Sequence, residues 1–249
     1  MTRVLVTGFE PFDGGAANPS QRLVEELAAA PPAGVELETA VLPVSYARAA
    51  EALLSALRHA APDVVICFGQ ADGRTGISVE RFAHNLDSDE PLDNDGVSSG
   101  AEIDPAGAVA YRSTLPVAEI VAALRAEGIP ASESRDAGGF LCNHVFYVLM
   151  RALEQERPEA RGVAPSRTHP GALARTMIVP PGSSPRGVAP SRTHPGALAR
   201  TMIVPPGPSP RGGFVHVPLL PEQALAQSAA SMPIELLVRA AHVVLRTVA

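Results

Sequence analysis

The stretch DAGGFLCNHVFY, residues 136–147, contains Cys142, one of two cysteines in the chain. A helical pattern begins at this residue, so we expect its thiol at a helix N-terminus, where the dipole and backbone N–H groups favour a thiolate and can hold an oxyanion. Gly138 and Gly139 would let the backbone approach a substrate closely. The alternative is a small buried residue, a common role for a cysteine. Cys67, within the apolar VVICFG, is typical of core packing.

A nucleophilic thiol needs a base, and the best candidate is His216. His169 and His194 lie in identical repeated sequences, so a unique role for either would require the two repeats to be placed differently. His144 follows Cys142 by two residues, and such neighbours on a helix point in different directions. His216 lies in GFVHVP at the end of an apolar strand, where open α/β sheets place their active groups.

The rest of the chain must position these groups, and it alternates between apolar strands and amphipathic helices. Asn18 and Pro19 are typical of a helix N-cap and first helical position. We expect strands at 3–9, 35–44, 63–69, 77–83 and 212–220, and helices at 18–30, 45–60, 116–128, 142–156 and 233–248. This order predicts a single three-layer α/β/α domain with a mixed, mostly parallel central sheet.

A tandem repeat interrupts this alternation. Residues 161–185 and 186–210 differ at one position and together hold 11 of the 25 prolines, six arginines and no acidic residue. We interpret 161–211 as a duplicated insert, either a loop or disordered, in a domain formed by 1–160 and 212–249. A basic arm for an acidic partner or a nucleic acid is the alternative, although the repeat lacks interleaved aromatic residues. Without its 50 residues, the thiol and the candidate base would be 74 − 50 = 24 positions apart.

Composition restricts the remaining functions. The 249 residues are 46% hydrophobic with a net charge of −6, which suits a globular protein with a sizeable core. No run of 18 uncharged apolar residues predicts a membrane span, and two cysteines do not make a disulfide framework. We therefore expect a cytoplasmic protein that binds neither membranes nor nucleic acids. No metal-ligand cluster or phosphate-binding glycine loop indicates a cofactor.

Four motifs occur in the order VLVTGFEPF…NPS, FGQADGRTGISVER, AGGFLCNHVFY and GGFVHVPLLPEQ. Over almost the whole chain outside the repeat, this sequence resembles the pyroglutamyl peptidase I (pyrrolidone-carboxylate peptidase) family of cysteine peptidases. The resemblance implies hydrolysis of the bond after an N-terminal pyroglutamyl residue, without a cofactor, through a thioester formed by a Glu80–Cys142–His216 triad. It implies a substrate pocket and, because family members often form tetramers, a homo-oligomer. The implied pocket residues are Phe9, Phe12, Asn18, Gln70 and Phe140.

Some of these roles have plain alternatives, and the chain departs from the family in places. Glu80 could be solvated or paired with Arg81 on an alternating strand, and Phe140 could be a core residue. In NLDSDEPLDN, Glu90 stands where the family's arginine is expected, which reverses the charge beside the site. This substitution and the insert leave open a second function, that of an impaired or inactive homologue which still binds pyroglutamyl peptides.

Overall fold

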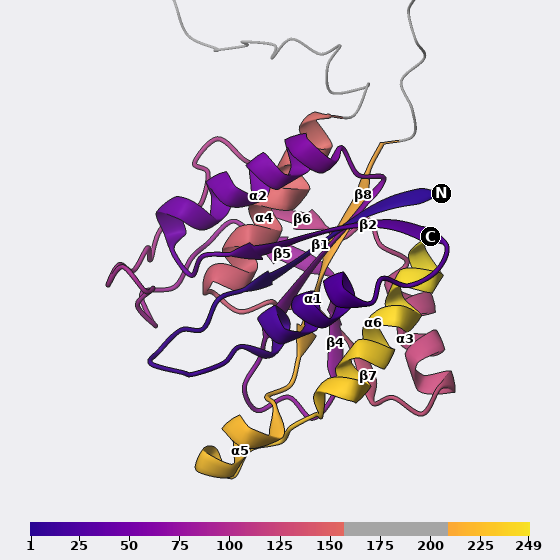
Figure 1. Cartoon of the computed structure of the whole chain (residues 1–249). Helices are drawn as coiled ribbons and strands as arrows, with labels where there is room; N and C mark the ends of the chain where they lie inside the picture. Colours follow the sequence, from indigo (N-terminus) through magenta and orange to yellow (C-terminus); the bar gives the residue numbers. More distant parts are fainter. Residues whose placement is uncertain (157–208) are drawn as a thin grey trace, which may run out of the picture.

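A six-stranded mixed sheet lies at the centre of the fold (Figure 1). The computed structural model describes residues 1–156 and 209–249. The sheet has the order β2-β1-β3-β8-β4-β7, and every neighbouring pair is parallel except β4 and β8, which are antiparallel. This confirms the predicted fold class. The strands are β1 (Thr2–Phe9), β2 (Val35–Leu42), β3 (Val64–Gln70), β4 (Ile77–Glu80), β7 (Ala131–Ser134) and β8 (Arg211–Val217).

Helices cover both faces of this sheet (Figure 1). One face packs against α1 (Pro19–Ala29), α3 (Val117–Ala126) and α6 (Ile234–Val248), and the other against α2 (Tyr46–Ala60) and α4 (Leu141–Gln155). Alternation along the strands separates the two cores. In β1, for example, Val4 and Val6 face the first group of helices, whereas Leu5 faces the second.

The Asn-Pro-Ser sequence begins α1 as the cap pattern predicts. The Asn18 side-chain oxygen accepts hydrogen bonds from the Ser20 N–H at 2.9 Å and the Ser20 hydroxyl at 2.8 Å. The Ser20 oxygen in turn accepts from the Phe9 N–H at 3.0 Å. The helix start is therefore tied directly to the carboxyl end of β1.

The ten predicted elements lie within a few residues of observed ones, with one exception. The predicted strand 77–83 is divided between β4 and β5 (Phe82–His84), and β5 pairs with β6 (Ala110–Arg112) in a separate two-stranded sheet. β6 and β7 were not predicted because they are short and have no buried apolar alternation. The short α5 (Pro221–Gln227) was also missed.

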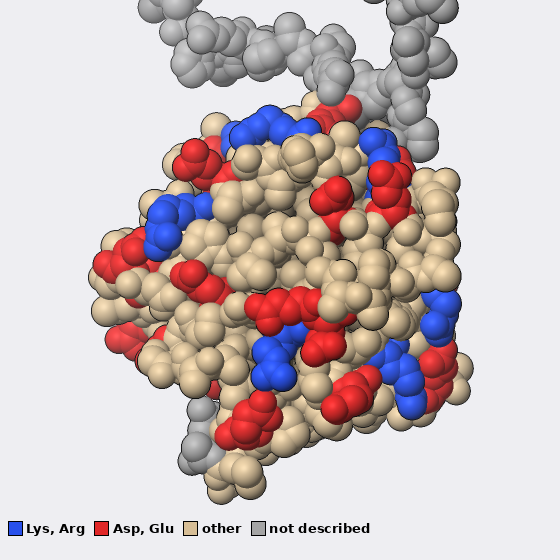
Figure 2. Space-filling model, in the orientation of Figure 1, with Lys and Arg blue, Asp and Glu red and all other residues tan. Residues whose placement is uncertain are grey.

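The predicted insert, 161–211, lies outside the described residues except for its last three positions. The chain is described again from Ser209, and β8 begins at Arg211. In the described parts, no helix is long and apolar enough to cross a membrane. On the face drawn in Figure 2, the acidic and basic side chains of described residues are interspersed, without a continuous basic patch.

Candidate active site

Cys142 lies in the first turn of α4, which begins at Leu141 after an extended Phe140. Its sulfur packs directly over Gly69 of β3, since a Cβ at Gly69 would lie 2.8 Å from the Sγ atom. In the register of the neighbouring parallel strands, Gly69 is the partner of His216 in β8. Because Gly69 has no side chain, the Cys142 thiol fits over β3 next to His216 on the neighbouring strand.

His216 and Glu80 are joined by a buried hydrogen bond. The Nδ1 atom of His216 lies 2.8 Å from Oε1 of Glu80, and the two side chains are 4% and 0% exposed. The same Oε1 atom accepts a hydrogen bond from Nη1 of Arg74 at 2.9 Å. Since Nδ1 is engaged by the carboxylate, Nε2 is the nitrogen left for a thiol.

Strand alternation explains why these side chains meet. Val79 in β4 and Val215 in β8 are partners and pack in the core on the α1 side. The positions next to them, which include Glu80 and His216, therefore point toward α4. β4 is the antiparallel neighbour of β8, so Glu80 reaches the imidazole from the adjacent strand. The Glu80 side chain is wholly buried there.

Burial sets the protonation of the thiol and the imidazole. Desolvation, reinforced by the negative charge of Glu80, raises the pKa of Cys142 to about 12. Desolvation also lowers the pKa of His216, although Glu80 opposes this shift. The resting pair is therefore a neutral thiol and a neutral imidazole. Burial therefore opposes the thiolate that the helix N-terminus was expected to favour.

His144, the histidine nearest to Cys142 in the sequence, is paired with a different carboxylate, that of Asp87. Its Nδ1 atom lies 2.9 Å from Oδ2 of Asp87, and its ring contacts Tyr46 edge-on at 5.4 Å. His84, another histidine near the site, places Nε2 3.2 Å from the backbone oxygen of Arg135.

A pocket of about 260 Å³ opens beside Cys142 and His216. All five residues expected to bind substrate line it, namely Phe9, Phe12, Asn18, Gln70 and Phe140. The Phe12 and Phe140 rings form an aromatic pair with centroids 5.9 Å apart. Val44 and Arg74 also line the pocket and were not predicted. Glu80 is not in the lining because it lies behind His216.

The two amide side chains of the lining already have protein partners. Asn18 caps α1 and donates from Nδ2 to the Glu10 backbone oxygen at 3.1 Å. Gln70 donates to Asp72 at 2.9 Å and accepts from Gln223 at 3.0 Å. An amide nitrogen carries two N–H groups and its oxygen two lone pairs, so both side chains keep capacity for a ligand.

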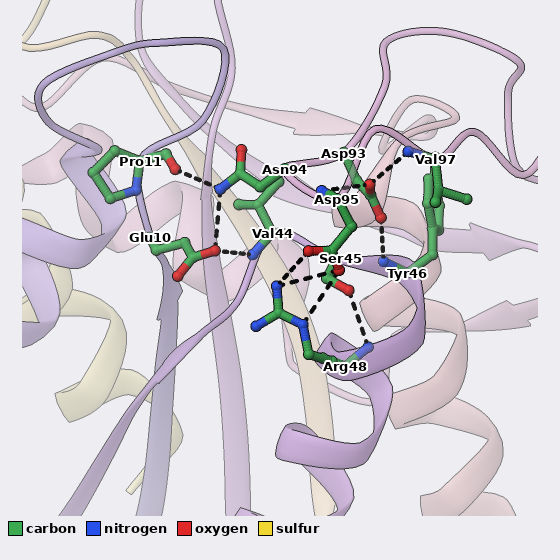
Figure 3. Close-up of polar contacts among 10 residues, drawn as sticks. All are labelled: Glu10, Pro11, Val44, Ser45, Tyr46, Arg48, Asp93, Asn94, Asp95 and Val97. Carbon is green, nitrogen blue, oxygen red and sulfur yellow. Dashed lines mark hydrogen bonds and ion pairs between the residues drawn. The ribbon is translucent and has the colours of Figure 1, made fainter.

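A polar network connects loops that contribute to the pocket wall (Figure 3). Glu10 Oε1 accepts from the Val44 N–H at 2.9 Å and from Asn94 Nδ2 at 3.1 Å, and the same nitrogen donates to the Pro11 oxygen at 2.9 Å. These bonds join the loops after β1 and β2, which carry Phe12 and Val44 of the pocket.

Asp93 braces the adjoining wall at the start of α2 (Figure 3). Its carboxylate accepts three backbone hydrogen bonds of 2.9 Å, from Tyr46, Asp95 and Val97. The Tyr46 ring packs edge-on against Phe140 at 5.8 Å. Asp93 therefore fixes the helix turn that supports this wall.

We expect Gly69→Ala to lower turnover by about 100-fold, because small displacements of a reacting group are costly. The added carbon would lie 2.8 Å from the Cys142 sulfur and 2.7 Å from the Phe214 ring, so one of them must move. Turnover and the alkylation rate of Cys142 by iodoacetamide would both be measured, with thermal unfolding to confirm a folded variant. Wild-type values for both rates would show that the thiol does not need this space.

Within residues 1–156 and 209–249, no group of three or more His, Cys, Asp and Glu side chains could hold a metal ion. The polar groups brought together here are instead a thiol, an imidazole and a carboxylate, beside a largely apolar pocket. On a three-layer α/β fold, this set of groups defines the class of cysteine hydrolases.

Comparisons with known proteins narrow that class. The family model described as pyroglutamyl peptidase matches residues 2–164. A pyrrolidone-carboxylate peptidase of Streptomyces coelicolor is 47% identical over 166 residues, covering 65% of this chain and 76% of the relative. One of Bacillus velezensis is 32% identical over 248 residues, covering 99% and 92%. The chain belongs to the pyroglutamyl peptidase family.

Solved structures agree with this assignment. Pyroglutamyl peptidase I of Bacillus amyloliquefaciens matches 100% of this chain and 97% of its own, with a TM-score of 0.75 and 32% identity. A mutant pyrrolidone carboxyl peptidase of Pyrococcus furiosus matches 99% and 97%, with a TM-score of 0.75 and 28% identity. The likeness therefore includes the strand that carries His216, which lies beyond the residues matched by the family model.

Proposed function

We propose that this protein is a cysteine peptidase that removes an N-terminal L-pyroglutamyl residue from peptides. The observation that carries the proposal is one pocket lined by Cys142, His216 and three phenylalanines, with Glu80 bonded to the imidazole behind it. Pyroglutamate is a neutral lactam without an ammonium group. A small apolar pocket with amide groups at its edge suits this ring better than a carboxylate would.

The first half of the reaction transfers the pyroglutamyl group to sulfur. His216 takes the proton from the Cys142 thiol as the sulfur attacks the pyroglutamyl carbonyl, since neither group is charged at rest. Glu80 holds the imidazole through Nδ1 and stabilises the cation that forms. The backbone N–H groups at the very start of α4, before those of Asn143 and His144 that donate to the Phe140 oxygen, support the oxyanion, because a helix start leaves such groups without an intrahelical partner.

The second half releases both products. The tetrahedral intermediate collapses, the peptide amine takes the proton from His216 and leaves, and Cys142 remains as a thioester. His216 then removes a proton from water, which attacks the thioester carbonyl and displaces the sulfur. The thiol regains its proton from the imidazolium, and pyroglutamate departs.

The pH dependence should reflect a neutral resting pair. We expect kcat/KM to fall as the pH drops through the pKa of His216, which burial holds below its ordinary value of 6.5. No rise should follow near pH 8.5, the ordinary pKa of a thiol, because that of Cys142 is raised to about 12. A stopped-time assay from pH 5 to pH 10 would measure both. A rising limb near pH 8.5 would mean that the thiol titrates at its ordinary pKa, which would contradict a neutral, buried thiol.

The function is tested with pyroglutamyl-aminocoumarin and prolyl-aminocoumarin as a matched pair. Proline keeps a five-membered ring but has a charged amine and no lactam carbonyl, so only the first substrate should be cleaved. Equal cleavage of both would contradict the pocket's proposed selectivity. Stabilisation of the protein by a pyroglutamyl peptide without turnover would instead support the alternative function, an inactive homologue that binds such peptides.

Glu90 is the residue that raised this alternative. It is exposed and does not belong to the pocket lining, and its backbone oxygen accepts a hydrogen bond of 2.6 Å from the Ser88 hydroxyl. The reversed charge therefore lies outside the surface on which we propose that the pyroglutamyl ring binds.

We also propose that residues 161–211 are an insert in a peptidase domain formed by 1–160 and 212–249. The support is that α4 and β8, the elements flanking this segment, carry Cys142 and His216 and pack against each other. Deleting 162–211 should leave pyroglutamyl-aminocoumarin cleavage intact. Loss of cleavage in a folded deletion variant would mean that the segment contributes to the site.

Cytoplasmic location and assembly into a homo-oligomer are further proposals. Both cysteines are free, which suits a reducing compartment. Exposed apolar side chains at Leu86, Leu92, Val97 and Val109 provide surface for a subunit contact. Light scattering of the purified chain would measure its mass, and a monomer at micromolar concentration would contradict the assembly.

A further inference from the structure

Arg74 connects two parts of the site that are far apart in the sequence. Its Nη1 atom donates to Glu80 Oε1 at 2.9 Å, and its Nη2 atom donates to the Asp136 backbone oxygen at 3.1 Å. The first contact reaches the carboxylate that holds His216. The second reaches the loop between β7 and α4, which leads into Cys142.

The contact with Glu80 supplies a charge that the buried carboxylate needs. The Glu80 side chain is 0% exposed, and its second oxygen, Oε2, is buried without a hydrogen-bond partner. A buried carboxylate is costly unless it is paired. His216 is neutral at rest, so it cannot balance this charge, whereas the Arg74 guanidinium can.

The contact with Asp136 fixes the approach to the nucleophile. The Asp136 side chain accepts a hydrogen bond of 2.9 Å from the Gly138 N–H, and Gly138 has a positive φ of 81° that favours glycine. The turn is therefore shaped by its own hydrogen bond and anchored to the sheet by Arg74. From there the chain passes through Phe140 into the first turn of α4.

We propose that Arg74 is a positioning residue of the peptidase reaction, which pairs with the buried Glu80 carboxylate and holds the loop before Cys142 at the correct distance. The inference rests on the proposed function, and it assigns to Arg74 a role that neither motif nor spacing indicated. Two directed donors with fixed geometry explain why arginine suits this position better than lysine.

Three variants separate the effect of the Arg74 charge from the effect of its two directed hydrogen bonds. In Arg74→Gln, His216 loses a neighbouring cation that lowers its pKa, so the acid midpoint of kcat/KM should rise by about one pH unit. Its kcat should fall about 10- to 100-fold, with little change in KM. Arg74→Lys keeps the charge but cannot make both contacts, so its midpoint should stay near that of the wild type while kcat falls. Arg135→Gln is the matched control, because it removes an exposed charge from the same loop.

The outcomes distinguish this inference from the proposed function. If the wild type cleaves pyroglutamyl-aminocoumarin, an unchanged acid midpoint in Arg74→Gln, or an equal shift in Arg135→Gln, would overturn the role of Arg74 and leave the function standing. Wild-type kcat in Arg74→Lys would overturn its role in positioning the loop.

If the wild type does not cleave the substrate, the proposed function fails, and Arg74 is tested by NMR titration of the His216 ring. A higher titration midpoint of His216 in Arg74→Gln than in the wild type would support the effect of the Arg74 charge on the imidazole. Equal midpoints in the two proteins would contradict it. Should Arg74→Gln not fold, Arg74→Met and Arg74→Lys, checked by near-ultraviolet circular dichroism, would provide the same comparison.

Discussion

Cys142→Ser is expected to lower pyroglutamyl-aminocoumarin cleavage by on the order of 10⁴-fold or more, because removal of a nucleophile eliminates the covalent route. A hydroxyl has nearly the same size as a thiol, so the packing over Gly69 is preserved. It is a much weaker acid than a thiol, so the imidazole of His216 removes its proton far less readily. Steady-state kinetics on the purified variant would measure the loss.

Cys67 provides the matched control for this change. It is fully buried in the core between β3 and α4, and burial raises its pKa to about 12. Cys67→Ser should therefore retain most of the activity, although it can lower the temperature of unfolding. If Cys142→Ser kept wild-type activity while Cys67→Ser lost it, the assigned nucleophile would be wrong.

Glu80→Gln is expected to lower kcat by about 10³- to 10⁴-fold, the range seen when the third member of a triad is removed. A glutamine at this position keeps the size of the side chain but loses its charge. The His216 cation formed in the reaction would lack its counter-charge, and the Arg74 guanidinium would face a neutral amide. Single-turnover kinetics would show a slow acylation step.

Glu133→Gln is the corresponding control on the neighbouring strand β7. Glu133 pairs with Arg81 at the partly exposed edge of the sheet, and such surface pairs contribute little. Its kcat should be close to that of the wild type. Equal losses in both variants would mean that the Glu80 effect comes from the sheet and not from the imidazole.

Regular elements were predictable because their signals are local. The cap at Asn18, the continuous apolar run of β3 and the amphipathic pattern of α2 each depend on a few adjacent residues. β7 and α5 were missed for the opposite reason. The strand ASES lies at the sheet edge with no fully buried residue, and α5 is only seven residues long. Neither segment therefore shows the hydrophobic periodicity of a strand or a helix.

The site residues also fall into two groups, those with a local signal in the sequence and those without one. Cys142 and His216 could be inferred from a helix start and a strand end, whereas Glu80 and the pocket residues depended on resemblance. Arg74 was not singled out, because its role follows from the burial of Glu80, and the sequence left Glu80 either solvated or paired with Arg81. The upward shift of the Cys142 pKa comes mainly from burial, and the sequence around Cys142 does not reveal how buried the thiol is.

The most direct test of the central claim is to locate the acyl group during turnover. The chain would be quenched in acid while it cleaves a pyroglutamyl peptide, then digested with trypsin, which cuts after Arg135 and Arg151 and separates the peptide containing Cys142 from that containing Cys67. We predict one added pyroglutamyl group, as a thioester, on the peptide spanning 136–151, and none in Cys142→Ala. Turnover without any acylated peptide, or with the group on Cys67, would contradict the account.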